Sequence, residues 1–374
     1  MLAIQKYLLA NGLEKTVAKF ELKTREYENK VLLKYDQLCG PSMMANQEVQ
    51  ECRGIILEKG SWKVMSLAFT KFFNAEESNA HKIDWETAHV LEKLDGSCIQ
   101  VYYDWNENVW YAGTTGTANG EGEVNNKLGT TFNQLFWNTV KEKYGLDGSK
   151  LNKGFTYVFE LTTPYNIVVK PHGESSASLL TVRNLETLQE VSFDELTAIA
   201  ESLGIPRVKE YDLSANNVGA LLRTFTNMVW HDEGYVVVDA NFNRVKIKNP
   251  AYVAVHHLKG KTAEHNIIAI VKTNEIEEFA ATFPDRKDEL YKLKENYDKL
   301  VNHLIEAWVE LKDYRPKNIT PAEKKKYAQS VFEVCAKRNI KNFTGLYFGL
   351  NEGKISSVED FIFNYDDKTL YKML

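Results

Sequence analysis

The chain has 374 residues, of which 44% are hydrophobic and 26% are charged, an ordinary balance for a globular protein without long disordered tracts. This length exceeds the size at which a single core usually stops growing, so two domains are expected. The formal net charge of -5 excludes a surface that is basic throughout, and any nucleic-acid site must therefore be local.

The N-terminus and the cysteines set further limits. Lys6 interrupts the first apolar stretch, and no run of about 18 apolar residues occurs, so neither a signal peptide nor a membrane span is expected. The four cysteines lie far apart, with no CxxC and no nearby histidine pair, which excludes a disulfide framework and a zinc site. A reducing, cytoplasmic location is the resulting expectation.

The first 250 residues are dominated by strand patterns. Residues 1–11 predict a short helix, and residues 16–36 alternate around a polar turn at 28–30, which predicts a hairpin. Further strands are expected near 52–58, 63–69, 88–93, 97–103, 109–114, 155–162, 179–184, 234–239 and 244–248, with helices near 123–144 and 193–203. We therefore expect an α+β domain over residues 1–250 with mostly antiparallel pairing.

The pattern changes after Pro250. Apolar residues recur at helical spacing along one stripe, with charges opposite, at Leu290, Leu293, Tyr297, Leu300, Leu304 and Trp308. Pro321 then suits the first turn of another helix. The sequence therefore predicts an all-helical domain over residues 251–374.

One short motif between two predicted strands carries a cation and a turn. Lys93, Asp95 and Gly96 form K-x-D-G, which alone is a weak signal because a lysine before an Asp-Gly turn is common in surface hairpins. A lysine is a covalent nucleophile only as the neutral amine, whereas its reference pKa of about 10.4 keeps it protonated. Burial and neighbouring cations favour the neutral amine. A catalytic role for Lys93 therefore requires other basic residues in the same pocket.

Basic residues elsewhere in the chain meet this requirement. Lys246 and Lys248 end a predicted strand two residues apart, so both side chains project to one face. Arg53 in ECRG and Lys71 in TKFFN each stand beside an apolar strand. A solvated strand face remains the alternative interpretation of the lysine pair taken alone.

Two acidic residues complete the pattern. Glu160 interrupts an otherwise apolar strand, where a carboxylate needs a cation, a metal or a hydroxyl as partner. Glu233 precedes Gly234 at the start of another apolar strand. Carboxylates for a divalent cation, with lysines and an arginine for phosphoryl oxygens, are typical of phosphate chemistry.

The order of these motifs resembles the covalent nucleotidyltransferase superfamily, the ligases and capping enzymes that form a lysine–nucleotide intermediate. ECRG and FFN ahead of the lysine, with a helical C-terminal region, resemble the bacteriophage T4 RNA ligase 1 family within it. The resemblance implies an antiparallel-sheet nucleotidyltransferase domain followed by an all-helical domain. It also implies an ATP-dependent enzyme that joins 5′-phosphate and 3′-hydroxyl RNA ends through lysine-AMP and an RNA-adenylate.

The resemblance assigns roles to the residues that bind the nucleotide. Lys93 would be the adenylylated nucleophile. Arg53 and Lys71 would hold the ATP phosphates, and Tyr35 matches a nucleotide-binding tyrosine of the family. Asp95 would orient the lysine and its loop, since a carboxylate can bond the backbone of a turn.

The remaining roles concern ribose, metal and the α-phosphate. Glu160 would contact the ribose and, with Glu233, serve the metal, expected to be Mg²⁺ with Mn²⁺ as a substitute. Lys246 and Lys248 would grip the α-phosphate. The chain departs from the family at Thr115, where relatives carry a lysine; the surrounding glycine-rich stretch is either a phosphate cradle or a hairpin turn.

The resemblance also implies partners, and it leaves alternatives open. Expected partners are nicked tRNA and an end-healing kinase/phosphatase, with the chain acting as a monomer in the cytoplasm of a phage host. The same lysine chemistry serves ATP-dependent DNA ligases and GTP-using capping enzymes, but these usually append an all-β OB-fold, whereas this chain turns helical. An inactive, nucleotide-regulated RNA-binding protein is a second alternative. The helical region either recognises structured RNA or merely supports the first domain.

Overall fold

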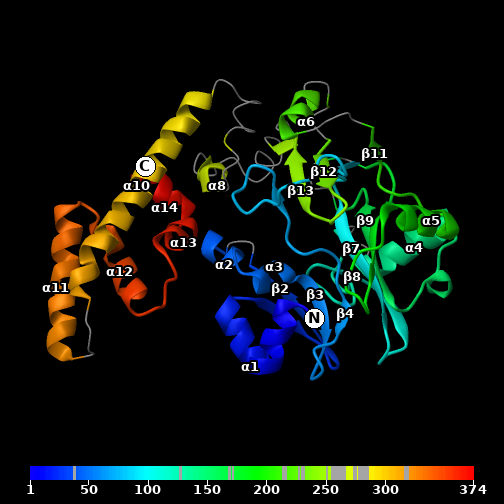
Figure 1. Ribbon diagram of the computed structural model, residues 1–374, viewed down its shortest axis with the longest axis horizontal. Helices are drawn as coiled ribbons and strands as arrows, with labels where there is room; N and C mark the ends of the chain where they lie inside the picture. Colours follow the sequence, from blue (N-terminus) through cyan, green and yellow to red (C-terminus); the bar gives the residue numbers. More distant parts are fainter. Residues whose placement is uncertain are drawn as a thin grey trace. The chain divides into compact units, whose positions relative to one another are not determined.

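The computed structural model describes residues 1–36, 39–125, 129–166, 170, 172–212, 217–225, 228, 232–249, 252–253, 267–272, 276, 286–315 and 320–374. The chain forms two compact units (Figure 1): Met1–Asp36 with Ala45–Gly260, and Gln37–Met44 with Lys261–Leu374. The functional division expected at residue 250 stays a prediction.

Three sheets build the first unit. Their orders are β1-β2-β3-β4, β10-β9-β7-β8 and β11-β6-β12-β13-β5, and among these strands only β13 and β5 pair in parallel. The strands are β1 (Lys23–Glu26), β2 (Lys30–Lys34), β3 (Arg53–Glu58), β4 (Val64–Ser66), β5 (Phe73–Asn74), β6 (His89–Glu92), β7 (Ser97–Asp104), β8 (Val109–Thr114), β9 (Phe155–Thr162), β10 (Ser176–Asn184), β11 (Glu210–Tyr211), β12 (Gly234–Val238) and β13 (Arg244–Lys248).

Two helices of the first unit begin at N-cap residues that the sequence supplies. The helical elements of this unit are α1 (Ala3–Phe20), α3 (Gln47–Glu51), α4 (Phe132–Tyr144), the 3₁₀ turn η1 (Gly148–Lys150), α5 (Phe193–Leu203) and α6 (Val218–Thr224). Thr131 caps α4, and Gln134 bonds back to the Thr131 backbone, which forms a capping box. Ser192 caps α5 in the same way through the Glu195 amide.

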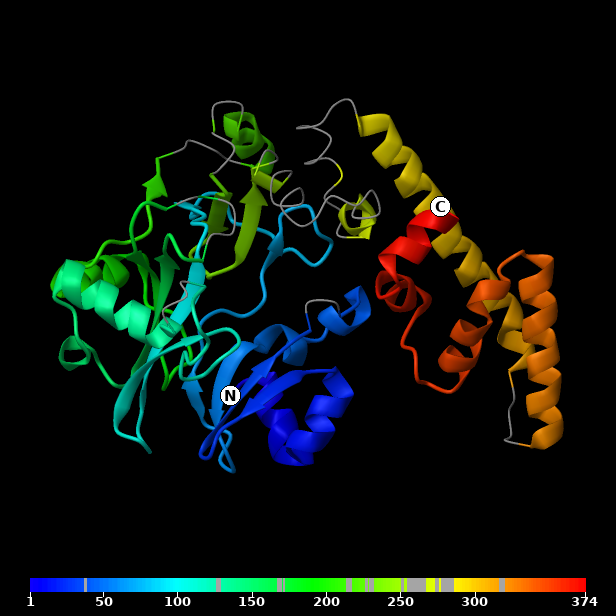
Figure 2. The ribbon, with the colours of Figure 1, turned by 180° about the vertical axis from the view of Figure 1, so that it is seen from behind.

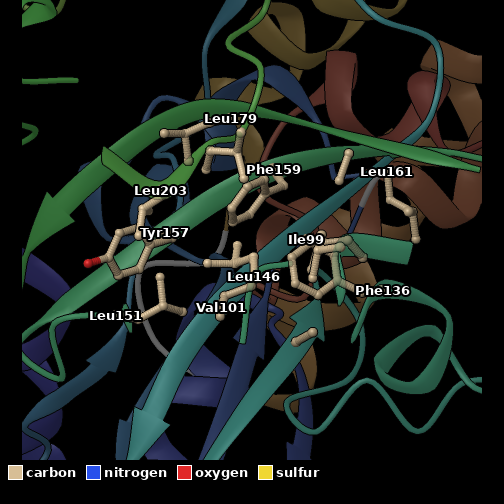
Figure 3. Close-up of a cluster of buried hydrophobic side chains, with 14 of the residues drawn as sticks. Ile99, Val101, Phe136, Leu146, Leu151, Tyr157, Phe159, Leu161, Leu179 and Leu203 are labelled. Atoms are coloured by element: carbon tan, nitrogen blue, oxygen red, sulfur yellow. The ribbon is translucent and has the colours of Figure 1, made fainter. Parts of the chain in front are cut away.

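A large core lies between the β10-β9-β7-β8 sheet and helices α4 and α5 (Figure 3). Along β9, Tyr157, Phe159 and Leu161 point into this core. Successive strand residues alternate between faces, so Val158 and Glu160 lie on the opposite face. Val158 packs there with Phe69 in a separate cluster. The period of two thus separates a packed face from the face that carries polar side chains.

The second unit is helical in the part that the structure describes (Figure 2). Its elements are α2 (Pro41–Met44), α8 (Ile267–Lys272), α10 (Lys287–Glu310), η5 (Leu311–Tyr314), α11 (Pro321–Lys337), η6 (Lys341–Phe343), α12 (Thr344–Asn351), α13 (Val358–Phe363) and α14 (Asp367–Met373). Leu304 on α10 is fully buried, and its carbonyl accepts a hydrogen bond of 3.2 Å from the buried Tyr347 hydroxyl. Pro321 stands in the first turn of α11, as predicted.

The α+β fold class is confirmed, with two local corrections. Helix α1 continues to Phe20 across a non-helical Gly12, although residues 16–20 were expected in a hairpin. Thr16 and Phe20 are buried on the same helical face, four residues apart, so their alternation with polar neighbours was coincidental. The helix expected over 123–144 begins only at Phe132, and residues 126–128 lie outside the described residues. None of the described helices is long and apolar enough to cross a membrane.

Candidate active site

A cavity of about 330 Å³ lies in the first unit, and most of the predicted site residues reach it. Its walls come from the end of β6, the starts of β3 and β7, Glu160 on β9 and both ends of β13. The lining side chains are Arg53, Phe69, Phe72, Leu91, Glu92, Lys93, Leu94, Asp95, Gly96, Cys98, Thr115, Glu160, Leu180, Val208, Glu233, Val236, Arg244, Lys248, Tyr252 and Val253. Charged groups of both signs therefore share one recess with an apolar wall.

Lys93 follows the last residue of β6, and its backbone N–H donates to the Gly234 carbonyl at 2.9 Å. This bond continues the pairing of β6 with β12 and places Lys93 beside Glu233. The Lys93 ammonium forms an ion pair with Glu233 Oε1, and the two side chains retain 20% and 11% of their exposure. The predicted nucleophile is therefore held by a carboxylate at the mouth of the cavity.

Asp95 connects the turn after Lys93 to distant segments. Its carboxylate accepts a bond from the Tyr252 hydroxyl at 3.0 Å and another from the Lys170 backbone N–H. The ring of His172 lies 2.8 Å from the Asp95 carbonyl. Gly96 is required next, because a Cβ there would approach the Leu161 carbonyl oxygen to 2.6 Å. Asp95 thus fixes the loop that carries Lys93, and Tyr252 supports that loop through its bond to Asp95.

Glu160 reaches the cavity from the polar face of β9. Burial raises its pKa to about 8, while the positive charge of Lys93 opposes this and the negative charge of Glu233 adds to it. In the nucleotide-free protein Glu160 therefore holds a proton near neutral pH. A neutral carboxyl can donate a hydrogen bond, and it becomes a metal ligand once it loses the proton.

Arg53 is the first residue of β3, and it lines the recess. Its guanidinium lies 5.2 Å from the Phe72 ring centre and 5.9 Å from that of Phe69. The Nη1 atom is buried and has no hydrogen-bond partner among the described residues. An unpaired buried donor is costly. An anionic ligand in the cavity would remove that cost.

Of the other residues predicted to bind the nucleotide, only some line the cavity. Lys248 lines it, whereas Lys71, Lys246 and Tyr35 do not. Lys71 lies 5.4 Å from the Tyr35 ring centre. Burial, together with the charges of Lys248, Lys71 and Lys93, lowers the pKa of Lys246 to about 7. These lysines are thus close enough to repel one another.

Sequence reasoning missed three residues of the cavity wall. Arg244 lines the cavity and stands two residues before Lys246 on β13, so the spacing in RVKIK already placed it on the lysine face. Phe69 and Phe72 flank the recognised Lys71 but were not assigned a role. Thr115, where the family resemblance implies a basic residue, does line the cavity.

Among the residues that the structure describes, no group of three His, Cys, Asp or Glu side chains is arranged to hold a metal ion. Mg²⁺ usually keeps several waters and binds through one or two carboxylates together with substrate phosphates. Glu233 and Glu160 both line the cavity and fit that mode of binding.

Comparison with known proteins identifies the family. Residues 51–252 match the model of the T4 RNA ligase 1 type, described as RNA ligase. An RNA ligase of Rhodothermus phage RM378 is 28% identical over 73% of this chain and 74% of its own length. A protein of Autographa californica nuclear polyhedrosis virus, provisionally named as a bifunctional polynucleotide kinase/RNA ligase, is 26% identical over 77% of this chain but only 42% of its own length. An archaeal ATP-dependent RNA ligase structure aligns over 93% of this chain and 83% of its own, at 13% identity and a TM-score of 0.44.

The cavity, the three sheets and the motif order define a nucleotidyltransferase. The matched segment covers more than half of the chain, and the chain belongs to the T4 RNA ligase 1 family of RNA ligases. The predicted activity, that of an RNA ligase, is thereby confirmed.

Proposed function

We propose that Lys93 is adenylylated by ATP in this cavity and that the chain then joins 5′-phosphate and 3′-hydroxyl RNA ends. The observation that carries the proposal is the position of the Lys93 amine. It is engaged by Glu233 in a recess that Arg53, Lys248 and Glu160 also line. Nucleophile, cations and carboxylates thus converge from five separate segments.

The reaction follows in three covalent steps. The neutral Lys93 amine attacks the α-phosphorus of ATP and a nitrogen–phosphorus bond forms. The bond between the α-phosphorus and the oxygen that bridges to the β-phosphorus breaks, and pyrophosphate leaves with that oxygen. The RNA 5′-phosphate then attacks the lysine-bound AMP, which releases Lys93 and forms an RNA-adenylate. Finally the 3′-hydroxyl oxygen attacks the 5′-phosphorus, a phosphodiester forms, and AMP leaves.

The first step needs the Lys93 proton to move, and Glu233 Oε1 is the acceptor that already contacts this amine. Asp95 would hold the turn so that the amine faces the α-phosphate. Its bond to Tyr252 supports that task. Glu160 would bond the ribose. Glu160 and Glu233 would also hold Mg²⁺, or Mn²⁺ in its place, which would offset phosphate charge.

The basic residues would divide the triphosphate among them. Arg53, with a buried N–H that lacks a partner among the described residues, would bind a phosphate oxygen, and Lys71 would assist beside Tyr35. Lys246 and Lys248 would stabilise the charge that builds on the α-phosphate oxygens. Repulsion among these lysines in the free protein would be relieved when the triphosphate binds.

The natural substrate we propose is a structured RNA with a broken loop, such as nicked tRNA. The helical second unit would recognise it. A partner that heals RNA ends would prepare the 5′-phosphate and the 3′-hydroxyl, and the viral relative named as a joint kinase and ligase supports such a pairing. A monomer in the cytoplasm remains our expectation.

The decisive experiment follows label transfer from α-labelled ATP to the protein. Lys93→Ala should abolish the covalent adduct, and Lys93→Arg should also fail because a guanidinium stays protonated. Lys141→Ala is the matched control, since Lys141 is exposed on α4, across the sheet from the cavity, and should keep full labelling. Label on the Lys93→Ala variant at the level of the control would refute the proposal.

A second measurement defines the polymer. End joining is compared on nicked tRNA, single-stranded RNA and nicked duplex DNA, with ATP and with GTP. We expect joining of RNA with ATP. Joining of nicked DNA alone would favour the DNA ligase alternative, and labelling by GTP alone would favour a capping-type enzyme.

A further inference from the structure

A buried ionic cluster lies behind the cavity wall. Glu190 accepts hydrogen bonds from Arg244 Nη1 at 3.0 Å and Nη2 at 2.8 Å, which is a bidentate pair. Arg183 Nη2 donates to the same carboxylate at 3.1 Å, and the Thr181 hydroxyl donates at 2.7 Å. The Glu190 side chain retains only 5% of its exposure. Its carboxylate is therefore fully committed to fixed donors.

The two arginines extend this order to the cavity. Arg183 donates from Nε and Nη2 to the Ala68 carbonyl at 3.2 and 3.1 Å, which anchors the segment just before Phe69. Arg244 lines the cavity and lies 4.6 Å from the Phe69 ring centre. The two arginines thus hold adjacent residues, Arg183 through the Ala68 backbone and Arg244 through the Phe69 ring.

The rings of Phe69 and Phe72 in turn contact Arg53. Phe69 and Phe72 meet edge to face at 5.9 Å, and the Arg53 guanidinium lies 5.2 Å from Phe72. Rings and guanidinium groups therefore alternate along the wall. Arg53 ends this series; it lines the cavity, and its buried Nη1 has no hydrogen-bond partner among the described residues.

We propose that Glu190 is a positioning residue for nucleotide binding. It fixes Arg244 and Arg183, which hold Phe69 and Phe72 so that the Arg53 guanidinium stays in the cavity wall, where it can bind a phosphate oxygen of ATP. Glu190 itself touches no substrate. The proposal rests on the function proposed above and adds a specific determinant of ATP affinity.

The physical reason is that a donor arranged before binding loses little entropy when the ligand arrives. Without the Glu190 charge, two buried guanidinium groups lose their common anion and are free to turn toward other acceptors. Arg244 would then leave the face of Phe69. Arg53 would lose the rings that hold it, and it would have to be ordered by the nucleotide itself.

The test measures the ATP dependence of Lys93 adenylylation in the full chain. Glu190→Gln should raise the half-saturating ATP concentration about tenfold, the loss expected for one charge-assisted hydrogen bond, with the maximal rate within about threefold of wild type. Arg53→Ala should raise it at least as much. Thr181→Val, which removes only one bond to Glu190, is the milder variant and should raise it about twofold.

A double-mutant cycle separates positioning from general stability. If Glu190 acts through Arg53, adding Glu190→Gln to Arg53→Ala should cause no further loss of ATP affinity. Additive losses would overturn the proposal, as would a lower melting temperature of Glu190→Gln or Thr181→Val with unchanged ATP dependence. A wild-type protein that forms no adduct would instead refute the proposed function.

Discussion

Glu160 and Glu190 are two carboxylates held among cations in the same unit, and their environments act in opposite directions. Burial raises the pKa of Glu160 to about 8, against the attraction of Lys93 and Arg53. Burial acts the same way on Glu190, but the charges and bonds of Arg244 and Arg183 outweigh it, and the pKa of Glu190 is lowered. The difference lies in the geometry of the partners.

This contrast separates a carboxylate that completes the fold from one that waits for a ligand. Glu190 has a bidentate arginine, a second arginine and a hydroxyl. The nearby cations at Glu160 act on it only at a distance, and Lys93 is paired with Glu233 instead. An incompletely satisfied charge in a cavity is typical of a functional site.

The largest expected effect is a difference of sign between two identical substitutions. Glu190→Gln should lower the free energy of unfolding by about 3 kcal/mol, because it leaves two buried guanidinium groups without their anion. Glu160→Gln should raise that free energy at neutral pH and abolish adenylylation. Chemical denaturation of both variants checks this, and destabilisation by both would remove the contrast.

The pH dependence of stability sharpens the same comparison. The folded pKa of Glu160 is about 8 and the ordinary pKa of a glutamate is 4.5, so between these values the unfolded chain releases a proton that the folded chain keeps. This residue's contribution to stability is therefore complete below its unfolded pKa and is lost as pH rises toward the folded pKa. The melting-temperature advantage of Glu160→Gln should be small near about pH 5 and largest above about pH 8.

Glu190 should show the opposite dependence. Its folded pKa is depressed, so its contribution is present above the unfolded pKa and is lost as pH falls through the folded value. The deficit of Glu190→Gln should therefore shrink only in acid. A deficit that instead shrank on going from neutral to alkaline pH would contradict the lowered pKa.

The sequence predicted most of the fold because the strands of the first unit alternate clearly. β7, β8, β9 and β13 fall where the period of two placed them, and α5 matches its predicted span. The two-residue strands β5 and β11 are too short to show a period. The end of α1 was misread because five residues fit a helix and a strand equally well.

The site was predictable only in part, for a physical reason. Local motifs indicated Lys93, Glu160 and Glu233, whose chemistry is unusual for their places in the chain. Arg244 had a signal in its spacing from Lys246 that was not used. Glu190 had no signal in the sequence, because its role depends on its hydrogen bond with an arginine 54 positions away. Tertiary contacts of that kind do not leave a local pattern.

A smaller effect is expected at Asp95. Its carboxylate lines the cavity, as Glu160 does, and accepts bonds from fixed donors, as Glu190 does. Tyr252→Phe removes the hydroxyl that bonds Asp95 Oδ1, and should cost about 1 kcal/mol of stability and slow adenylylation severalfold by loosening the Lys93 turn. Tyr144→Phe is the matched control, because its hydroxyl bonds Ser176 at 2.8 Å on the α4 side of the sheet. Equal slowing by both variants would show that the Asp95 contact has no special role.

The smallest expected effect is the uptake of a fraction of a proton when the nucleotide binds. It tests whether the pKa of a cation near Glu160 is shifted as the pKa of Glu160 is. The pKa of Lys246 is about 7, so at about pH 8 its amine is mostly neutral. A bound triphosphate favours the charged amine, and we expect uptake of about half a proton per nucleotide at that pH, falling toward zero near about pH 6. Calorimetry with a non-reactive ATP analogue in two buffers of different ionisation enthalpy measures this uptake. Lys246→Met should abolish it. Uptake that persisted in this variant would assign the proton to Glu160 or another group and leave Lys246 outside the phosphate site.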